Sequence, residues 1–136
     1  MMENRRISRI PPTAEELAAL YFDAGFTDVI NVKKLERAVA STSEWYVVRD
    51  DAGSAIGIGR FISDYARYAC VYDLIVEKSW RDKGIGRRIM EEIIHDCRLL
   101  ELDVVHLWPS GDKVDFYRAL GFEPLGADQP FMKLKN

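Results

Sequence analysis

The sequence predicts an α/β fold with a mixed, mostly antiparallel sheet and helices on both faces. Two β-rich stretches, residues 45–49 and 55–62, flank a short turn and read as a hairpin. Two further apolar stretches, residues 68–76 and 104–108, precede and follow a strongly amphipathic one, residues 86–100. A hairpin followed by a strand, a helix and a strand is the element order of a mixed α/β sheet.

The first forty residues are expected to form a short strand and two helices. Residues 6–10 suit a strand, which two prolines end. Thr13 followed by Glu16 has the capping-box pattern, in which each side chain accepts a hydrogen bond from the other residue's backbone N–H. Gly25 ends this first helix, and residues 31–40 are expected to form the second.

The strands that follow are expected to be buried. Residues 68–76 are apolar almost throughout, which favours burial on both faces of that strand. Asp73 is the only acid inside this stretch. Residues 104–108 are expected to form another buried strand. A short helix over residues 114–120 should then lead to two closing strands, residues 122–125 and 131–135.

Size and charge narrow the class of protein. The chain of 136 residues suits one domain spanning 1–136, and a net charge of −3 without a long run of Lys or Arg does not suit a nucleic-acid binder. No apolar run is long enough to cross a membrane, and residues 1–10 lack the apolar core of a leader peptide. Cys70 and Cys97 form no CxxC pair, and His95 points away from Cys97 on the same helix. We therefore expect a cytoplasmic protein without a metal, a membrane or a nucleic acid as partner.

The segment 81–88 carries the strongest chemical signal. Four of its residues are cations at the N-terminus of the best helix, where the helix dipole disfavours positive charge: Arg81, Lys83, Arg87 and Arg88. Gly84 and Gly86 leave backbone N–H groups open to close approach. A bound anion accounts for both features, because helix N-termini bind phosphate groups. The alternative is a solvated basic turn that the glycines merely shape.

The pattern also limits which anion is expected. The sequence has no GxxxxGK[ST] motif, which excludes a P-loop. A dinucleotide-binding fingerprint would need a glycine where Ile89 stands, and the pair Gly57 and Gly59 fails in the same way at Ile62. A dinucleotide-binding fold is therefore disfavoured.

Two motifs in the second half of the chain resemble one known family. Arg81-x-x-Gly84-x-Gly86, following the strand residues 73–76, is similar to the acetyl-CoA signature of the GNAT superfamily of N-acetyltransferases. Residues 116–122, Phe-Tyr-Arg-Ala-Leu-Gly-Phe, resemble the closing FYxxxGF element of that superfamily. Residues 114–124 also look like small plastid and bacterial members that acetylate arylalkylamines or lysine. The resemblance implies a central pair of parallel strands that splay apart to admit CoA.

The resemblance also implies a role for individual residues. Backbone N–H groups of residues 81–86 would hold the CoA pyrophosphate, with added charge from side chains of this loop. Residues of the preceding strand would run beside the pantetheine arm, and one of their N–H groups would lie near the thioester carbonyl. The cofactor-binding residues expected on this basis are Leu74, Ile75, Val76, Arg81, Asp82, Lys83, Gly84, Ile85, Gly86 and Arg87.

Acyl transfer to an amine needs an acid and a base, and two residues are candidates. The resemblance places Tyr117 near the sulfur, where a phenol with a reference pKa of about 10 can protonate the leaving thiolate. Asp73 is a candidate for taking the proton of the incoming ammonium group. In the structural alternatives, Tyr117 is a core tyrosine and Asp73 only hydrogen-bonds backbone at a strand irregularity.

The sequence departs from the family pattern at two positions. Ser110 stands where many members have an Asn that contacts the pantetheine, so this contact is expected to be weaker or missing. Asp82 stands where a Gly is common, and its negative charge near a phosphate is mildly unfavourable.

The function expected from the sequence is direct transfer of acetyl from acetyl-CoA to a primary amine of a small molecule or a protein lysine. One alternative is a catalytically silent acyl-CoA-binding module that regulates a partner, and another is an interaction domain without a CoA site. The identity of the amine is left open. So is the oligomeric state, with a homodimer common among the proteins that this chain resembles.

Overall fold

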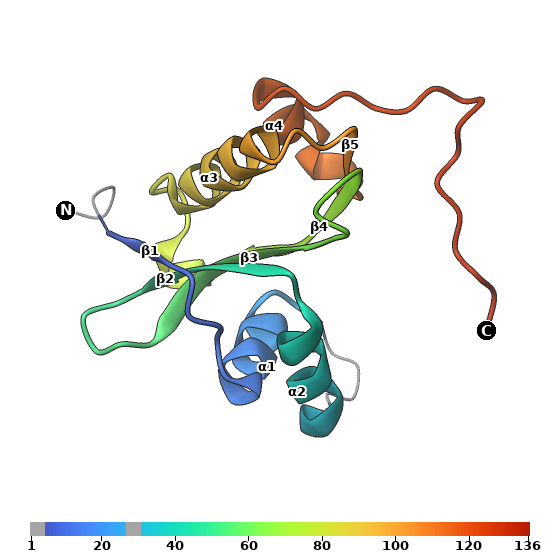
Figure 1. Ribbon diagram of the computed structural model, residues 1–136. Coiled ribbons are helices and arrows are strands. Elements are labelled where there is room, and N and C mark those ends of the chain that lie inside the picture. Colours follow the sequence, from blue (N-terminus) through green and yellow to red (C-terminus); the bar gives the residue numbers. More distant parts are fainter. Residues whose placement is uncertain (1–4, 27–30) are drawn as a thin grey trace.

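The computed structural model describes residues 5–26 and 31–136 (Figure 1). Residues 1–4, part of the stretch examined for a leader peptide, lie outside the described residues. The elements in chain order are β1 (Ile7–Ser8), α1 (Ala14–Asp23), α2 (Val32–Ser41), β2 (Glu44–Arg49), β3 (Ala55–Ser63), β4 (Tyr68–Val76), α3 (Ile85–Leu99), β5 (Val104–Leu107) and α4 (Val114–Ala119). Short 3-10 turns, Lys78–Trp80 and Gly111–Lys113, precede α3 and α4.

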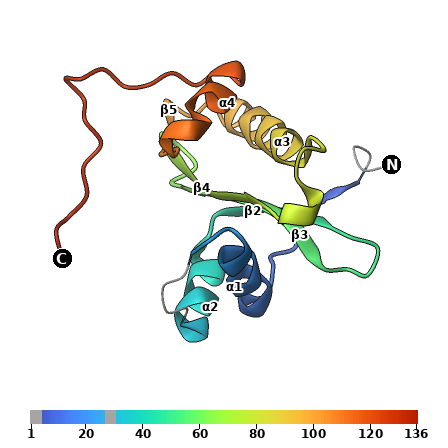
Figure 2. The same ribbon diagram turned by 180° about the vertical axis from the view of Figure 1, so that it is seen from behind.

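The strands form one sheet in the order β1-β2-β3-β4-β5. Neighbouring strands are antiparallel except β4 and β5, which are parallel and joined through α3. Helices α1 and α2 cover one face of the sheet, and α3 and α4 lie on the other (Figures 1 and 2). The predicted mixed sheet with helices on both faces and a parallel pair of strands is confirmed.

Two hydrophobic clusters hold these layers together, one on each face of the sheet. The first joins α3 to the sheet and includes Tyr46, Phe61, Val71, Ile89 and Ile93. The second joins α1 to the opposite face and includes Leu17, Leu20, Trp45, Ile58 and Ile75. Because each buried Leu, Ile or Phe side chain stabilises the fold by about 1.5–3 kcal/mol, these clusters fix the positions of α1 and α3 against the sheet.

Two glycines on β3 let α3 lie close to the sheet. A Cβ atom added to Gly57 would lie 2.9 Å from Cγ2 of Ile85, and one added to Gly59 would lie 2.8 Å from Cγ2 of Ile89. These distances are shorter than carbon atoms tolerate, so a larger residue on β3 would push α3 outward. The glycines therefore let the first turns of α3 lie against β3.

The prediction of two closing strands, residues 122–125 and 131–135, is wrong. The chain forms no helix or strand from Leu120 to Asn136. Figure 1 shows this segment running away from the body of the molecule. A strand needs a neighbour for its backbone hydrogen bonds, and no element among residues 5–26 and 31–136 pairs with this segment.

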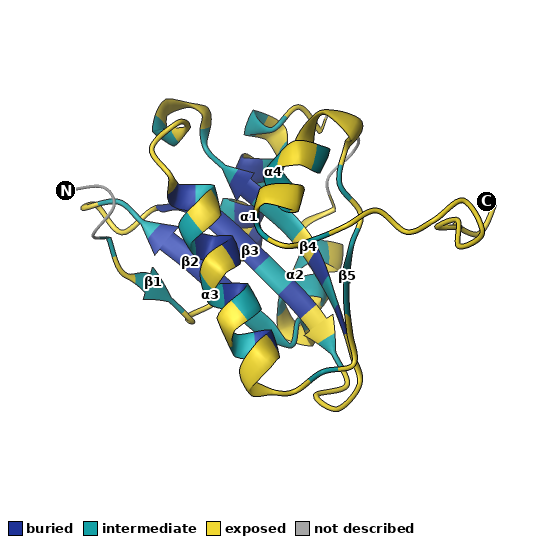
Figure 3. Cartoon of the chain, turned by 90° about the horizontal axis from the view of Figure 1, so that it is seen from above, coloured by how far each residue is buried: buried dark blue, intermediate teal, exposed yellow. Residues whose placement is uncertain are grey.

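Three further expectations about the strands need correction, and Figure 3 shows the burial of each element. Residues 104–108 are not a buried strand, because β5 lies at the edge of the sheet and Val104 and Trp108 are exposed. β4 is not buried on both faces, because Tyr68 and Tyr72 are exposed and only Ile75 of this strand enters the cluster beneath α1. The first strand covers Ile7–Ser8 rather than residues 6–10.

Candidate functional site

An opening between β4 and β5 lies at the centre of the candidate site. The two strands pair only from Tyr68 with Val104 to Val71 with Leu107. The second half of β4, residues 72–76, has no strand neighbour on that side within the described parts of the chain. Its backbone N–H and C=O groups on that side are therefore available to a ligand that enters the opening.

A β-bulge interrupts β4 at the start of this opening. Arg60 lies opposite Tyr72 whereas Ile58 lies opposite Ile75, so β4 has one residue more than β3 across this interval. Asp73 has φ +55°, a left-handed conformation that is uncommon for residues other than glycine. The bulge shifts the alternation of side chains, and Leu74 packs on the cluster beneath α3 while Ile75 packs beneath α1.

The loop between β4 and α3 presents an uncapped helix N-terminus. Gly84 is the N-cap of α3, has φ +81° and offers no side chain for capping. Asp82 also has a left-handed backbone, at φ +61°. The first N–H groups of an α-helix have no partner inside the helix, and the positive end of the helix dipole lies there. The backbone N–H of Arg81 donates to the carbonyl of Lys78 at 3.3 Å, so the N–H groups that an anion would meet are those of the residues after Arg81, up to Gly86.

Gly86, which has no side chain, lies where α3 faces the end of β4. A Cβ atom added to Gly86 would lie 3.7 Å from Cγ2 of Val76 and 3.8 Å from Cδ2 of Leu74, which are ordinary contacts. The protein by itself would therefore accept an alanine here. Gly86, Leu74 and Val76 are three predicted cofactor-binding residues that the structure brings together.

The cationic side chains of the loop differ in the contacts that they make. Nε of Arg81 donates a hydrogen bond to the carbonyl oxygen of Val76 at 3.0 Å, which ties the loop to the end of β4. Nε of Arg87 lies 3.7 Å from Oε1 of Glu91, and both side chains are more than half exposed. Lys83 is exposed as well. Exposed ion pairs such as that of Arg87 contribute about 0–1 kcal/mol, so an incoming anion can compete for this side chain.

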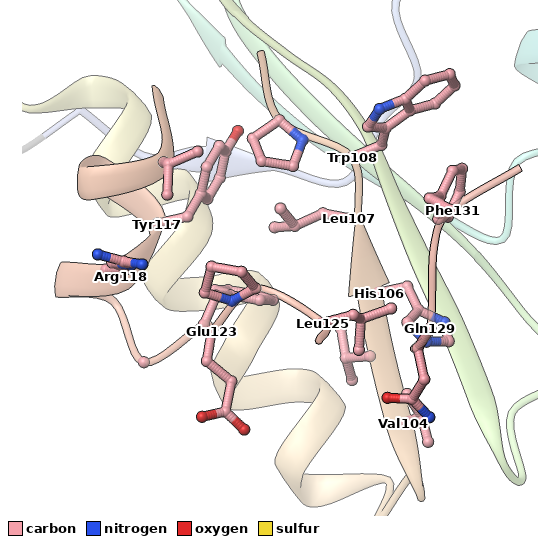
Figure 4. A pocket seen from close by; sticks show the side chains of 16 residues that line it. Val104, His106, Leu107, Trp108, Tyr117, Arg118, Glu123, Leu125, Gln129 and Phe131 are labelled. Carbon is pink, nitrogen blue, oxygen red and sulfur yellow. The ribbon is translucent and has the colours of Figure 1, made fainter. Parts of the chain in front are cut away.

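Tyr117 lies on α4 and lines a groove of about 440 Å³ between α4, β5 and residues 121–131 (Figure 4). Its ring packs edge-on against Phe116 and Phe122, with ring centroids 5.0 Å and 6.0 Å apart. Burial raises the pKa of the Tyr117 hydroxyl above its ordinary value of 10.0, because the phenolate would lose solvation. Tyr117 therefore carries its proton at neutral pH.

Asp73 belongs to a cluster of side chains that the sequence did not reveal. The hydroxyl of Tyr21 and Nε of Arg60 both donate to Oδ2 of Asp73, at 2.6 Å and 2.9 Å. Nη1 of Arg60 also donates to Oγ1 of Thr42 at 2.9 Å. Tyr21 comes from α1 and Arg60 from β3, so sequence spacing gave no signal of this contact. The cluster holds Asp73 on the face of the sheet beneath α1.

The two candidate catalytic residues lie on opposite faces of the sheet. Asp73 contacts Tyr21, which packs on the cluster beneath α1, whereas Tyr117 packs on the cluster beneath α3. The opening between β4 and β5 lies between these two residues and faces both sides of the sheet. A group bound in this opening could accept a nucleophile from the side of Asp73 and release its leaving group toward Tyr117.

Ser110 lies after β5 and is exposed. Its hydroxyl donates to Oδ1 of Asp112 at 2.8 Å, so the side chain is already engaged at the turn before α4.

Among residues 5–26 and 31–136, no group of three or more His, Cys, Asp or Glu side chains could hold a metal ion. Within the same ranges, no helix has the length and apolar character needed to cross a bilayer.

Comparison with known proteins identifies the family of this chain. The sequence profile of the acetyltransferase (GNAT) domain matches residues 41–124. A histone acetyltransferase of Glycine max is 32% identical over 68 residues, which are 50% of this chain and 29% of that protein. A chloroplastic serotonin N-acetyltransferase of Oryza sativa subsp. japonica is 34% identical over 94 residues, which are 66% of this chain and 46% of that protein. The chain thus spans less than half the length of these two curated relatives.

Solved structures of other proteins are similar to this one over nearly the whole chain. A protein of unknown function from meticillin-resistant Staphylococcus aureus, described as a probable acetyltransferase, superposes with a TM-score of 0.85 at 25% identity over 96% of this chain and 98% of that one. A GNAT-family acetyltransferase of Streptococcus pneumoniae TIGR4 gives a TM-score of 0.79 at 29% identity over 96% of both chains. The profile match includes the bulge, the loop before α3 and Tyr117. The chain belongs to the GNAT family of acetyltransferases.

Proposed function

We propose that this protein transfers an acetyl group from acetyl-CoA directly to a primary amine. The observation that carries the proposal is the opening between β4 and β5, which begins at the bulge and leads to the uncapped N-terminus of α3. An elongated ligand with an acyl group at one end and phosphates at the other suits this arrangement. Acetyl-CoA is such a ligand, and the GNAT family uses it as acyl donor.

In this proposal the pyrophosphate occupies the N-terminus of α3. Backbone N–H groups of residues 82–86 donate to the phosphate oxygens, while that of Arg81 donates to the carbonyl of Lys78 at 3.3 Å. Lys83 and Arg87 add positive charge. The pantetheine arm lies along the unpaired half of β4, beside Leu74, Ile75 and Val76. Gly86 has no side chain where α3 faces Leu74 and Val76, so the arm can approach the backbone of α3 closely at this point.

The chemical step follows from the placement of Asp73 and Tyr117. Asp73 takes a proton from the ammonium group, directly or through a water molecule, and the free amine attacks the thioester carbon. The C–N bond forms, negative charge develops on the carbonyl oxygen, and an N–H group of β4 near the bulge stabilises that charge. The C–S bond then breaks, and the Tyr117 hydroxyl gives its proton to the departing thiolate of CoA. The nitrogen of the new amide gives up its extra proton through water to the Tyr117 phenolate, which restores the hydroxyl.

The acceptor is a cationic amine in this account, either of a small molecule or of a protein lysine. Oδ2 of Asp73 already accepts from Arg60 and Tyr21, so the cation would approach the other carboxylate oxygen. Two exposed aromatic side chains are close by: Tyr72 precedes Asp73, and Phe26 packs on the ring of Tyr21. The serotonin N-acetyltransferase relative supports an arylalkylamine as the first substrate to test, and the histone acetyltransferase relative supports a lysine peptide as the second.

A panel of amines tests the function. The full chain is incubated with acetyl-CoA and either serotonin, a polyamine or a lysine-containing peptide, and the released thiol is measured. We expect release that depends on one of the amines. If calorimetry shows CoA binding but no amine gives thiol release, the chain is a silent acyl-CoA-binding module. If neither CoA binding nor thiol release is found, the chain is an interaction domain.

The role of Tyr117 is tested by Tyr117→Phe, with Tyr68→Phe on the exposed part of β4 as the control. General-acid catalysis contributes about 10²–10⁴-fold, so kcat should fall at least tenfold in Tyr117→Phe while the CoA affinity is retained. Tyr68→Phe should behave like the parent. If kcat of Tyr117→Phe stays within about twofold while chemistry limits the rate, another group protonates the thiolate.

A further inference from the structure

The groove beside Tyr117 is larger than an acetyl group needs. Its volume is about 440 Å³, and residues of β5, of α4 and of the segment 121–131 line it (Figure 4). Pockets that hold whole drug-sized ligands have volumes of about 300–1,000 Å³. The acyl part of acetyl-CoA has only a methyl group beyond the carbonyl carbon. Transfer of acetyl therefore leaves most of this groove unused.

The half-buried part of the lining is largely apolar. Most of its half-buried side chains are hydrocarbon: Val105, Leu107, Pro109, Val114 and Phe122. His106 and Tyr117 are the half-buried lining residues that carry a polar group. The charged lining residues, Arg118 and Glu123, are exposed. Such a lining suits a hydrocarbon chain better than a charged ligand, because a charge would lose solvation inside the groove.

One end of this groove lies at the opening between β4 and β5. Leu107 and Val71 are the last pair that joins the two strands, so the opening begins beside Leu107. Leu107 and Tyr117 both line the groove, and Figure 4 shows the side chain of Leu107 on the side of β5 that faces Tyr117. In the proposed function the thioester lies in this opening with its sulfur toward Tyr117. Acyl carbons beyond the thioester carbonyl are then next to Leu107, at the entrance of the groove.

The groove is long enough for a chain of several carbons. It follows β5 from Leu107 to Val104 (Figure 4). A strand rises about 3.3 Å per residue, so these two residues are about 10 Å apart along the strand. A hexanoyl group has five C–C bonds of about 1.5 Å, so its length stays below about 8 Å. The groove can therefore take up the whole hydrocarbon part of a hexanoyl group.

We propose that this groove binds the hydrocarbon chain of acyl-CoA donors longer than acetyl-CoA, up to about the length of a hexanoyl group. The proposal rests on the proposed function, since the same CoA site must hold the donor. Val105, Leu107 and Leu125 contact the chain, and its end points toward Val104. The protein then transfers straight aliphatic acyl groups in addition to acetyl.

The chemical step is the same for the longer donor. Asp73 takes a proton from the ammonium group, and the free amine attacks the thioester carbon of hexanoyl-CoA. The C–N bond forms and the C–S bond breaks. Tyr117 gives its proton to the CoA thiolate and regains one from the amide nitrogen through water. The products are an N-hexanoyl amide and CoA, so one thiol is released for each amide formed.

Calorimetric titrations of the full chain with hexanoyl-CoA and acetyl-CoA test the proposal. Hexanoyl-CoA has four more methylene groups, and each fully buried methylene group tightens binding about fourfold. Burial in the groove is incomplete, because Leu125 and Phe131 in its lining are each about half exposed. We therefore expect an affinity for hexanoyl-CoA that is at least tenfold higher than that for acetyl-CoA.

A matched pair of variants locates the acyl chain. Leu125→Glu puts a carboxylate into the lining, which would lose solvation beside the chain, so the preference for hexanoyl-CoA over acetyl-CoA should fall to within about twofold. Leu125 belongs to neither hydrophobic cluster, so this variant should melt like the parent. Leu134→Glu makes the same change at a residue that is 92% exposed and does not line the groove, and it should keep the full preference.

Acetyl-CoA is the reference that separates this proposal from the proposed function. Equal affinities for the two donors would overturn the proposal and leave the acetyltransferase intact, because the groove would then be closed to the chain or filled by another part of a protein. An unchanged preference in Leu125→Glu would also overturn it, because the chain would lie elsewhere. If neither donor binds, the proposed function fails together with this proposal.

Discussion

Two glycines in the same loop have different physical reasons to be glycine. Gly84 has φ +81°, a conformation that costs residues with a Cβ about 1–2 kcal/mol. Gly86 lies in the first turn of α3 with an ordinary backbone, and a Cβ there meets only ordinary contacts. The backbone therefore favours a glycine at position 84 but not at position 86. A ligand beside Leu74 and Val76 would explain the second glycine.

This difference gives a prediction for Gly86→Ala. Alanine is favoured over glycine in helices by up to about 1 kcal/mol, so the melting temperature of Gly86→Ala should equal or exceed that of the parent. Its affinity for CoA, measured by calorimetry, should fall at least tenfold because the methyl group occupies the path of the pantetheine arm. Gly84→Ala is the matched variant and should lower the melting temperature. Normal CoA binding by Gly86→Ala would show that this glycine only shapes the turn.

Asp73 provides a second test at the scale of one residue. If its carboxylate takes the proton of the ammonium group, Asp73→Asn should lose most of its activity at neutral pH. The loss should shrink as the pH rises toward the amine's own pKa, about 10.4 for a lysine-like amine, because the substrate then arrives without its proton. A plot of kcat/KM against pH for parent and variant measures this recovery.

Tyr21→Phe is the control for Asp73→Asn, since it removes one hydrogen bond to the carboxylate and leaves the carboxylate in place. Its deficit in kcat/KM should be small and should not depend on pH in this way. A deficit in Asp73→Asn that is equally large at neutral and high pH would assign Asp73 a structural role in the bulge.

At the scale of elements, the first turn of α1 is fastened to the β2–β3 hairpin through Glu16. The predicted capping box is present, with the backbone N–H groups of Glu16 and Thr13 each donating to the other side chain at 3.0 Å. Oε2 of Glu16 also accepts hydrogen bonds from the N–H of Ala55 at 3.0 Å and from Nη1 of Arg49 at 2.8 Å. Burial by itself raises the pKa of Glu16, but the hydrogen bonds from Thr13, Ala55 and Arg49 together lower it below 4.5.

Glu16→Gln should therefore destabilise the fold in a way that depends on pH. A lowered pKa means that the folded state favours the carboxylate, so this stabilisation is present above the ordinary pKa of 4.5 and is lost as the pH falls below it. Because a hydrogen bond to a charged group contributes about 1.5–3 kcal/mol, urea unfolding at pH 7 should show a loss of about 2 kcal/mol. The difference from the parent should shrink at lower pH.

Glu15→Gln removes the same charge from the same helical turn but at an exposed position, and it should change stability by less than about 0.5 kcal/mol. An equal loss in Glu15→Gln and Glu16→Gln would mean that interaction with the helix dipole, rather than the contacts to β3 and Arg49, accounts for the effect.

The elements also show which features a sequence can predict. The capping box, the β2–β3 hairpin and α3 follow from patterns within a few residues, and all three are present. The bulge in β4 was not predicted beyond the odd position of Asp73, because it depends on the register of β4 against β3. The cluster of Tyr21, Arg60 and Asp73 was missed because its members come from three different elements.

At the scale of the whole molecule, the fold class was predicted and the edge of the sheet was not. The apolar character of residues 104–108 and 131–135 predicted a buried strand and a closing strand, but composition does not say whether a neighbouring strand is available. Among residues 5–26 and 31–136, β5 is an edge strand and no strand pairs with the segment after α4. Burial predicted from composition alone therefore failed for both segments.

The central claim is that CoA lies in the opening between β4 and β5 with its pyrophosphate at the N-terminus of α3. Calorimetric titration of the full chain with CoA and, in parallel, with pantetheine, which has the same arm but no phosphate, tests this most directly. We predict that CoA binds at least a hundredfold more tightly than pantetheine and that its affinity falls as salt is added, because charge and N–H groups hold the pyrophosphate. Equal affinities for the two ligands, or a CoA affinity that salt leaves unchanged, would contradict the account.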